Sequence, residues 1–209
     1  MKLPEYYRNE IFTGKLSRFY DLIFFATTFG LGDITRKNIL KFISEHDKKI
    51  LDLATGTGSS AIVIKNKFKN AKVYGADLSK EMLEIARKKN KKIKFSLQNI
   101  EKTNFKSNSF DIVTISFGLH EIPLENRYNV IKEAYGLLKK KGKFIMLDFH
   151  APKNIFLRLL FLLFVKIAEP YGKSFLRQDL VSNLKKYKFY NIKKIDYYNS
   201  LFQIIYGVK

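Results

Sequence analysis

The residues best suited to chemistry form a glycine-rich turn, Gly56-Thr57-Gly58, two residues after the predicted strand 49–53. Glycine has no Cβ, so such a turn lets backbone N–H groups approach a ligand closely at the start of a helix. Ala61 stands where the dinucleotide fingerprint has its third glycine, which weakens that interpretation without removing it. Asp52 favours a different ligand, because a carboxylate there repels a pyrophosphate and suits a cationic amine or sulfonium.

A second acidic residue, Asp77, ends the next predicted strand and lies 21 residues after Gly56. At this distance in a strand–helix–strand unit, a carboxylate can accept hydrogen bonds from both hydroxyl groups of a ribose. The alternative is that Asp77 caps the following helix, although Ser79 is better placed to do so. Together, the glycine-rich turn, Asp52 and Asp77 predict an adenosyl ligand without a pyrophosphate.

The elements that must position these residues alternate between short apolar strands and amphipathic helices, after an N-terminal helical region in which Asp33 is expected to cap a helix over 34–43. This alternation predicts an α/β fold with a mostly parallel sheet and helices on both faces. The predicted strands are 49–53, 72–76, 93–97, 110–115 and 143–149, the helices 59–68, 79–90, 125–139 and 175–187, and a terminal antiparallel hairpin pairs 190–198 with 201–208.

The chain has no internal repeat and no low-complexity linker, so its 209 residues are expected to form a single domain. Within it, 1–45 form the N-terminal helical region and 46–150 the cofactor-binding core. Residues 151–209 supply a substrate-side helix and the terminal hairpin.

Composition narrows the classes of function. The absence of Cys excludes disulfides, a thiol nucleophile and Cys-ligated metal sites. The formal net charge of +20 is compatible with nucleic acid, with an anionic membrane surface or with a Lys-rich genome. Because 32 of the 39 basic residues are Lys, and proteins that read phosphates favour Arg, nucleic acid is the disfavoured partner.

The longest apolar segment, 155–168, carries Arg158 and Lys166 on nearly one side of a predicted helix. It is shorter than the roughly 20 residues that cross a bilayer. Such a helix covers the core or a dimer interface, or lies in the surface of an anionic membrane. Residues 1–5 lack the apolar run of a signal peptide, so the sequence predicts a cytoplasmic protein or one peripheral to a membrane.

These motifs resemble those of class I S-adenosylmethionine-dependent methyltransferases and, within that superfamily, the ubiquinone/menaquinone biosynthesis C-methyltransferases. The resemblance implies a Rossmann-like, seven-stranded sheet whose last strand is antiparallel, in agreement with the predicted hairpin. It also implies S-adenosyl-L-methionine as the cofactor and no metal. The matching segments are 20–22, 29–31, 50–58, 74–83, 108–111, 113–119, 137–143 and 196–199.

By this resemblance, the turn residues Gly56, Thr57 and Gly58 cradle the methionine part of the cofactor, with Asp52 near its amino group and Asp77 on the ribose. Further positions complete the implied cofactor site: Asn99 and Ile100 flank the adenine, Ser116 lines the methyl-donor pocket, and Ala54 and Leu78 lie beside the turn and the ribose acid.

Two departures from the family lie on the substrate side and therefore bear on the acceptor. The family commonly has Arg after the Phe-Gly-Leu motif, where this chain has His120. The segment between Phe149 and Phe175 is shorter and more apolar than the family pattern.

Two of the three histidines follow predicted strands at the edge where an open α/β sheet binds its ligand. His120 is the candidate base, which would deprotonate a phenolic hydroxyl and make the ring nucleophilic; the alternative is a polar loop residue. His150 follows Asp148 by two residues, and the two are expected to form a supporting pair rather than a catalytic one. His46 lies in a charged turn and is expected to be solvated.

The resulting hypothesis is a methyltransferase that acts on a lipophilic small molecule, namely a ring carbon of a demethylmenaquinol or polyprenyl benzoquinol. Three alternatives stay open: N-methylation of a phospholipid headgroup, methylation of RNA or protein, and a non-catalytic protein that binds an adenosyl ligand. The RNA alternative is weakened because the chain has no Cys and because 116–119 is not an Asn/Asp-Pro-Pro-aromatic motif. The sequence leaves the oligomeric state open.

Overall fold

The structure, a computed structural model, describes residues 4, 6, 15–168 and 170–209. Residues 1–3 and 5, which enter the prediction that there is no signal peptide, lie outside the described residues. The same holds for 7–14 of the predicted N-terminal helical region.

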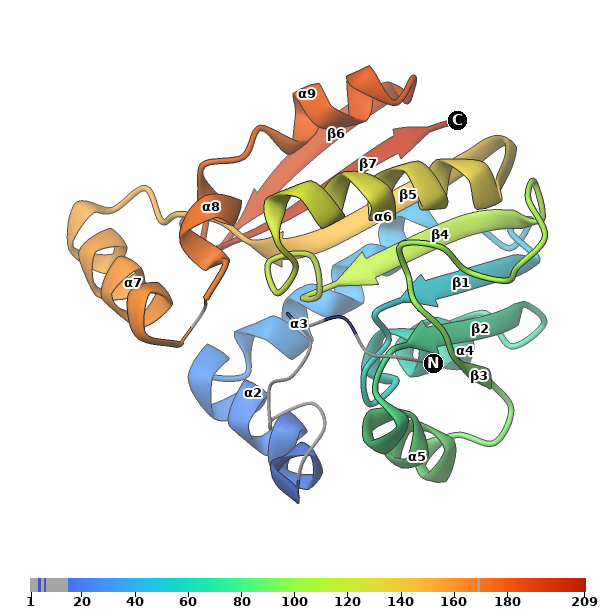
Figure 1. The fold of residues 1–209 in the computed structure, drawn as a ribbon, viewed down its shortest axis with the longest axis horizontal. Coiled ribbons are helices and arrows are strands. Elements are labelled where there is room, and N and C mark those ends of the chain that lie inside the picture. Colours follow the sequence, from blue (N-terminus) through green and yellow to red (C-terminus); the bar gives the residue numbers. More distant parts are fainter. Residues whose placement is uncertain (1–3, 5, 7–14, 169) are drawn as a thin grey trace.

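A seven-stranded sheet with the order β3-β2-β1-β4-β5-β7-β6 forms the centre of the fold (Figure 1). Neighbouring strands are parallel except where β7 pairs with β5 and β6. The predicted mostly parallel sheet with its terminal antiparallel hairpin is therefore confirmed. The strands are β1 Lys49–Leu53, β2 Lys72–Asp77, β3 Lys94–Leu97, β4 Phe110–Ser116, β5 Leu138–Phe149, β6 Tyr190–Tyr197 and β7 Phe202–Val208.

Helices cover both faces of this sheet. The helical elements of the described residues are η2 Lys15–Phe19, α2 Tyr20–Thr28, α3 Leu31–Lys37, η3 Asn38–Phe42, α4 Ser59–Lys67, α5 Lys80–Lys89, α6 Leu124–Leu137, α7 Ile155–Ala168, α8 Gly172–Leu176 and α9 Leu180–Lys186. On one face α6, α8 and α9 bury side chains such as Ile131 and Leu184. On the other face α2, η3, α4 and α5 bury side chains such as Phe24 and Leu83, so each face has its own core.

Three features differ from the sequence prediction. Helix α3 already begins at Leu31, so Asp33 lies inside its first turn and does not cap a helix that starts at residue 34. The single helix expected over 175–187 is two helices, because Asp179 interrupts the segment and caps α9 by accepting a hydrogen bond from a backbone N–H. Strand β5 begins at Leu138, earlier than predicted, and its pairing with β4 is irregular at that end.

The carboxyl ends of the parallel strands share one edge of the sheet, and α2, α3 and α7 lie beyond that edge (Figure 1). This is the edge at which open α/β sheets bind their ligands. Among the described residues, none of the helices combines the length and the apolar character needed to cross a membrane.

Candidate functional site

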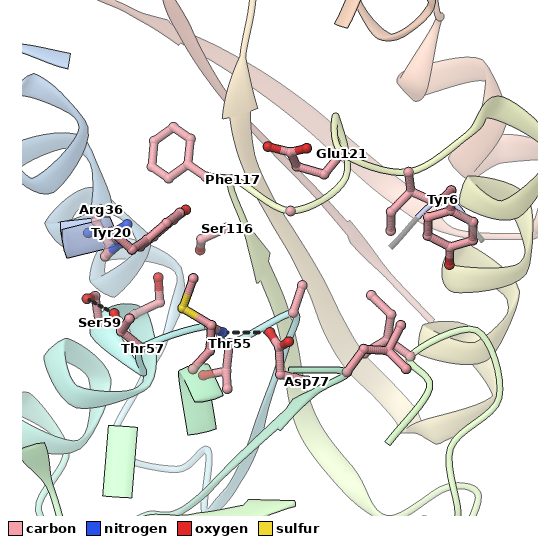
Figure 2. A pocket seen from close by; sticks show the side chains of 18 residues that line it. Tyr6, Tyr20, Arg36, Thr55, Thr57, Ser59, Asp77, Ser116, Phe117 and Glu121 are labelled. Carbon is pink, nitrogen blue, oxygen red and sulfur yellow. Dashed lines mark hydrogen bonds between the residues drawn. The ribbon is translucent and has the colours of Figure 1, made fainter. Parts of the chain in front are cut away.

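A solvent-open pocket lies at the carboxyl ends of β1, β2 and β4 (Figure 2). Asp77 and Glu121 approach it from opposite sides of the view. Many of the residues predicted to bind the cofactor line this pocket: Ala54, Gly56, Thr57, Asp77, Leu78, Ile100 and Ser116. Among the described residues that line the pocket, four predicted site residues are missing: Asp52, Gly58, Asn99 and His120.

The glycine-rich turn directs only one of its glycines toward the pocket. Gly56 and Gly58 have φ values of 53° and 82°. A Cβ on Gly56 would meet no atom within 4 Å, whereas a Cβ on Gly58 would lie 2.9 Å from Cζ of Phe95. Thr57 Oγ1 donates a hydrogen bond of 2.6 Å to Asp21, which ties the turn to α2. Gly56 therefore leaves space for a ligand, while Gly58 permits close packing beneath the turn.

Asp52 lies beneath the turn and is 1 % exposed. Its carboxylate accepts hydrogen bonds from Thr55 Oγ1 at 2.7 Å and from Thr114 Oγ1 at 2.6 Å. Burial raises the pKa of Asp52 to about 6, although the two hydroxyl groups and Arg36 act in the opposite direction. Because Thr55 lines the pocket, Asp52 is placed to act on a ligand through that side chain; its contact with a methionine amino group stays a prediction.

Asp52→Asn is expected to stabilise the ligand-free protein by about 2 kcal/mol at pH 8 and to have little effect near pH 4. The pKa of Asp52 is raised by folding, so its contribution to stability is present below the unfolded value of 3.8 and lost as the pH rises through about 6. Asn can bond both threonine hydroxyls without burying a charge. Urea unfolding at both pH values measures the difference, and a variant less stable than the parent at pH 8 would contradict this reasoning.

Asp77 is both a wall residue and the support of the turn. Its Oδ2 accepts a hydrogen bond from Gly56 N at 2.7 Å, and its Oδ1 accepts one from Ser79 N at 2.9 Å. Ser79 caps α5 by accepting from Met82 N at 3.0 Å, which confirms the predicted cap. An Asp77→Ala variant would therefore disturb the turn as well, so its loss of cofactor affinity would not isolate the ribose contact.

On the opposite side of the pocket, His120 is buried against two carboxylates. Its Nδ1 lies 2.6 Å from Asp148 Oδ1, and its Nε2 lies 3.4 Å from Glu121 Oε1. Burial lowers the pKa of His120, but Asp148 and then Glu121 raise it, and the result is a pKa well above the usual value. The two carboxylates therefore favour the protonated form of the imidazole. Glu121 lines the pocket and is the member of the group that a ligand can reach.

The expected pairing of Asp148 with His150 is wrong. Asp148 bonds His120 and also accepts a hydrogen bond from Leu119 N at 3.1 Å. His150 Nε2 lies instead 3.0 Å from Lys194 Nζ. Residues two apart share a face only while a strand continues, and β5 ends at Phe149, between the two. His46 is exposed, as expected.

The side chain of Asn99, the last predicted site residue, bonds the backbone of its own loop. Its Oδ1 accepts a hydrogen bond from Glu101 N at 2.9 Å, which closes the turn after β3. Its neighbour Ile100 reaches the pocket wall, so this loop contributes one of the two residues predicted to flank an adenine.

Two wall residues from the amino-terminal helices, Tyr20 and Arg36, were not predicted from the sequence (Figure 2). Arg36 is 6 % exposed, and its guanidinium carbon lies 4.9 Å from the ring centre of Phe24 and 5.5 Å from that of Phe117. Its Nε is buried without a hydrogen-bond partner among the described residues. The available signal was an arginine within an apolar helical region of a chain whose basic residues are mostly Lys.

Comparisons with known proteins agree with this geometry. The model of the ubiE/COQ5 methyltransferase family matches residues 1–200. A demethylmenaquinone methyltransferase of Thermotoga maritima is 34 % identical over 141 residues, which are 67 % of this chain and 61 % of that protein. A ubiquinone/menaquinone biosynthesis C-methyltransferase UbiE of Rickettsia akari is 30 % identical over 211 residues, which cover 96 % of this chain and 72 % of that protein. The chain thus spans only about three-fifths of the Thermotoga relative.

Solved structures share the fold at lower identity. An O-methyltransferase family protein from Burkholderia thailandensis has a TM-score of 0.72 at 17 % identity, over 98 % of this chain and 66 % of that chain. Phosphoethanolamine N-methyltransferase 2 of Haemonchus contortus, solved with S-adenosyl-L-methionine, has a TM-score of 0.66 at 18 % identity, over 84 % of this chain and 52 % of that chain. These likenesses concern the fold, whereas the family model matches nearly the whole sequence. This chain belongs to the ubiE/COQ5 methyltransferase family.

Proposed function

We propose that this protein is an S-adenosyl-L-methionine-dependent methyltransferase that methylates a ring carbon of a lipophilic quinol. The observation that carries the proposal is one pocket in which the turn at Gly56 and the carboxylate of Asp77 face the same space as Glu121. Family membership supports the activity. The names of the Thermotoga and Rickettsia relatives support a demethylmenaquinol or polyprenyl benzoquinol as the acceptor.

The wall residues fit an adenosyl cofactor. Asp77 offers a carboxylate to a ribose, while Leu78 and Ile100 offer apolar contact to an adenine. Ser116 Oγ is buried without a hydrogen-bond partner among the described residues and would gain one from a ligand. The unpartnered Arg36 Nε suits the carboxylate of the methionine part. When bound, the cofactor would supply a sulfonium methyl group, and its transfer would leave the carbon–sulfur electron pair on sulfur.

Glu121 is the residue that would accept the proton of the acceptor's ring hydroxyl. Loss of that proton makes the neighbouring ring carbon nucleophilic. Once this carbon has bonded the methyl group, its C–H bond would break, the hydrogen would leave as a proton to solvent, and the ring would regain its aromaticity. His120 does not border the pocket, so in this proposal it is a positioning residue: Asp148 fixes its ring, and its Nε2 faces Glu121. Glu121 thus takes the role of base that the sequence suggested for His120, and His120 acts on the acceptor through Glu121.

Glu121→Gln is expected to lower kcat about 100-fold while it changes the dissociation constant of S-adenosylhomocysteine less than about twofold. The amide keeps the shape of the side chain but cannot accept the proton. Glu125→Gln, at an exposed position in the first turn of α6, is the matched control and should leave both values unchanged. A Glu121→Gln enzyme with unaltered kcat would remove this residue from the reaction.

A second variant separates positioning from structure. His120→Gln removes the ring whose Nε2 faces Glu121, so kcat should fall while the dissociation constant of S-adenosylhomocysteine stays within about twofold of the parent value. A purely structural role would weaken cofactor binding together with kcat.

The reaction itself is tested by transfer of a radiolabelled methyl group to three separate acceptors: a demethylated quinol kept reduced, phosphatidylethanolamine, and total RNA. Label in the quinol supports the proposal. Label that enters only the phospholipid or only the RNA would overturn it in favour of one of the alternatives raised by the sequence.

A further inference from the structure

Helix α2 presents an apolar face to solvent. Its inward side chains Phe24 and Thr28 are buried, whereas Leu22 is 64 % exposed, Phe25 54 % and the C-terminal cap Phe29 87 %. The one acidic residue of the helix, Asp21, is ion-paired with Lys89. An apolar helix face of this kind is uncommon on a soluble monomer and marks a surface that contacts something apolar.

Helix α7 repeats the pattern. It packs through Val165, which is 4 % exposed, and through Phe161, whose ring centre lies 5.8 Å from that of Phe149. On its outer side, Ile155, Phe156 and Leu159 are more than 60 % exposed. The 14 residues of this helix include no acidic side chain.

Both helices lie beyond the carboxyl-end edge of the sheet, at the same end of the molecule (Figure 1). Tyr20 of α2 lines the pocket. Phe149, on which α7 packs, also contacts the ring of His120 behind Glu121. The two apolar faces therefore flank the part of the fold where the proposed acceptor enters.

The charge beside these faces is positive. Arg18 precedes α2, and Arg158 and Lys166 lie on α7; all three are exposed. The chain as a whole carries a formal net charge of +20. A second copy of the chain would bring the same charge to the same surface, which opposes self-association, whereas anionic headgroups would neutralise it.

We infer that α2 and α7 form a membrane-docking surface that seats this protein on an anionic lipid bilayer, with the pocket facing the lipid. Apolar side chains of the two helices enter the boundary between headgroups and acyl chains, and the basic side chains meet the headgroup phosphates. The inference rests on the proposed function in one respect: the pocket of the docked protein would receive a lipophilic acceptor that stays in the bilayer.

The test measures sedimentation of the full chain with vesicles of phosphatidylcholine alone or mixed with phosphatidylglycerol. We expect binding to the mixed vesicles to be at least about tenfold tighter and to weaken with salt. The variant Leu22→Ser/Phe29→Ser/Leu159→Ser/Leu163→Ser should lose at least about tenfold in vesicle affinity. Tyr190→Ser, which removes an exposed aromatic side chain at the start of the edge strand β6, should lose none.

Each variant is also checked for S-adenosylhomocysteine affinity and for turnover of a short-chain, water-soluble quinol, both of which should match the parent. A parent protein that binds neither kind of vesicle overturns the docking surface even if it methylates the soluble quinol. Vesicle binding without methylation of any quinol supports the surface and counts against the proposed function. The oligomeric state of both proteins in solution is the last measurement. If the parent is a dimer and the variant with four serine substitutions is a monomer, a second copy of the chain covers these helices, and the inference is overturned.

Discussion

Gly56→Val is expected to reduce the affinity for S-adenosylhomocysteine more than about 1000-fold, or about 4 kcal/mol. Two effects combine. The φ value of 53° at this position disfavours a β-branched residue by about 1–2 kcal/mol, so the turn of the free variant relaxes to another conformation and binding must restore the strained one. The new side chain would also point into space that holds no protein atom within 4 Å of its Cβ, in the wall of the pocket. Isothermal titration with the purified protein measures the loss.

The matched control is Gly136→Ala in the last turn of α6. A Cβ there also meets no atom within 4 Å, but the position is helical and outside the pocket wall. This control should bind as the parent does and change the free energy of unfolding by less than about 0.5 kcal/mol, because the position lies in the last turn of the helix. A Gly56→Val protein that remains folded and binds within about tenfold of the parent would place the cofactor elsewhere.

The parts of the fold that could be predicted are those encoded by short, continuous stretches of sequence. The central residues of strands such as β1 are mostly apolar because helices cover both faces of the sheet, and the predicted bounds 49–53 are those observed. The glycine-rich turn and Asp77 are likewise local features, since each lies at the carboxyl end of its own strand. The parallel pairing of β1 with β2 then brings Gly56 N to the carboxylate of Asp77.

The parts that could not be predicted depend on tertiary packing. Arg36 reaches the pocket only because α2 and α3 fold back over the glycine-rich turn, where the guanidinium stacks near Phe24 and Phe117. No period or spacing in the sequence encodes that contact. The sequence placed Asp148 at the correct end of β5 but predicted the wrong partner, His150. The true partner, His120, follows from where the strand ends and from the path of the loop after β4.

Asp148→Ala is expected to lower the free energy of unfolding by about 3–5 kcal/mol near pH 6. The carboxylate is buried and bonds His120 Nδ1 as well as the backbone N–H groups of Leu119 and Phe149. Without it, the interior holds an imidazolium ion whose close partner is gone and backbone donors that lose their acceptor. Chemical denaturation at several pH values measures the effect.

The pH dependence of that loss identifies the ion pair. Folding raises the pKa of His120, so the contribution of the pair is fully present below the unfolded value of 6.5 and is lost as the pH rises through the folded value. The difference between the parent and Asp148→Ala should therefore be widest near pH 6 and should narrow toward pH 10. Lys139→Gln, which breaks an ion pair with Asp111 whose lysine is 45 % exposed, should change stability by less than about 1 kcal/mol. An equal loss from Asp148→Ala at pH 6 and pH 10 would mean that Asp148 acts through backbone N–H groups alone. His120 would then be neutral, and it would have no positive charge with which to hold Glu121.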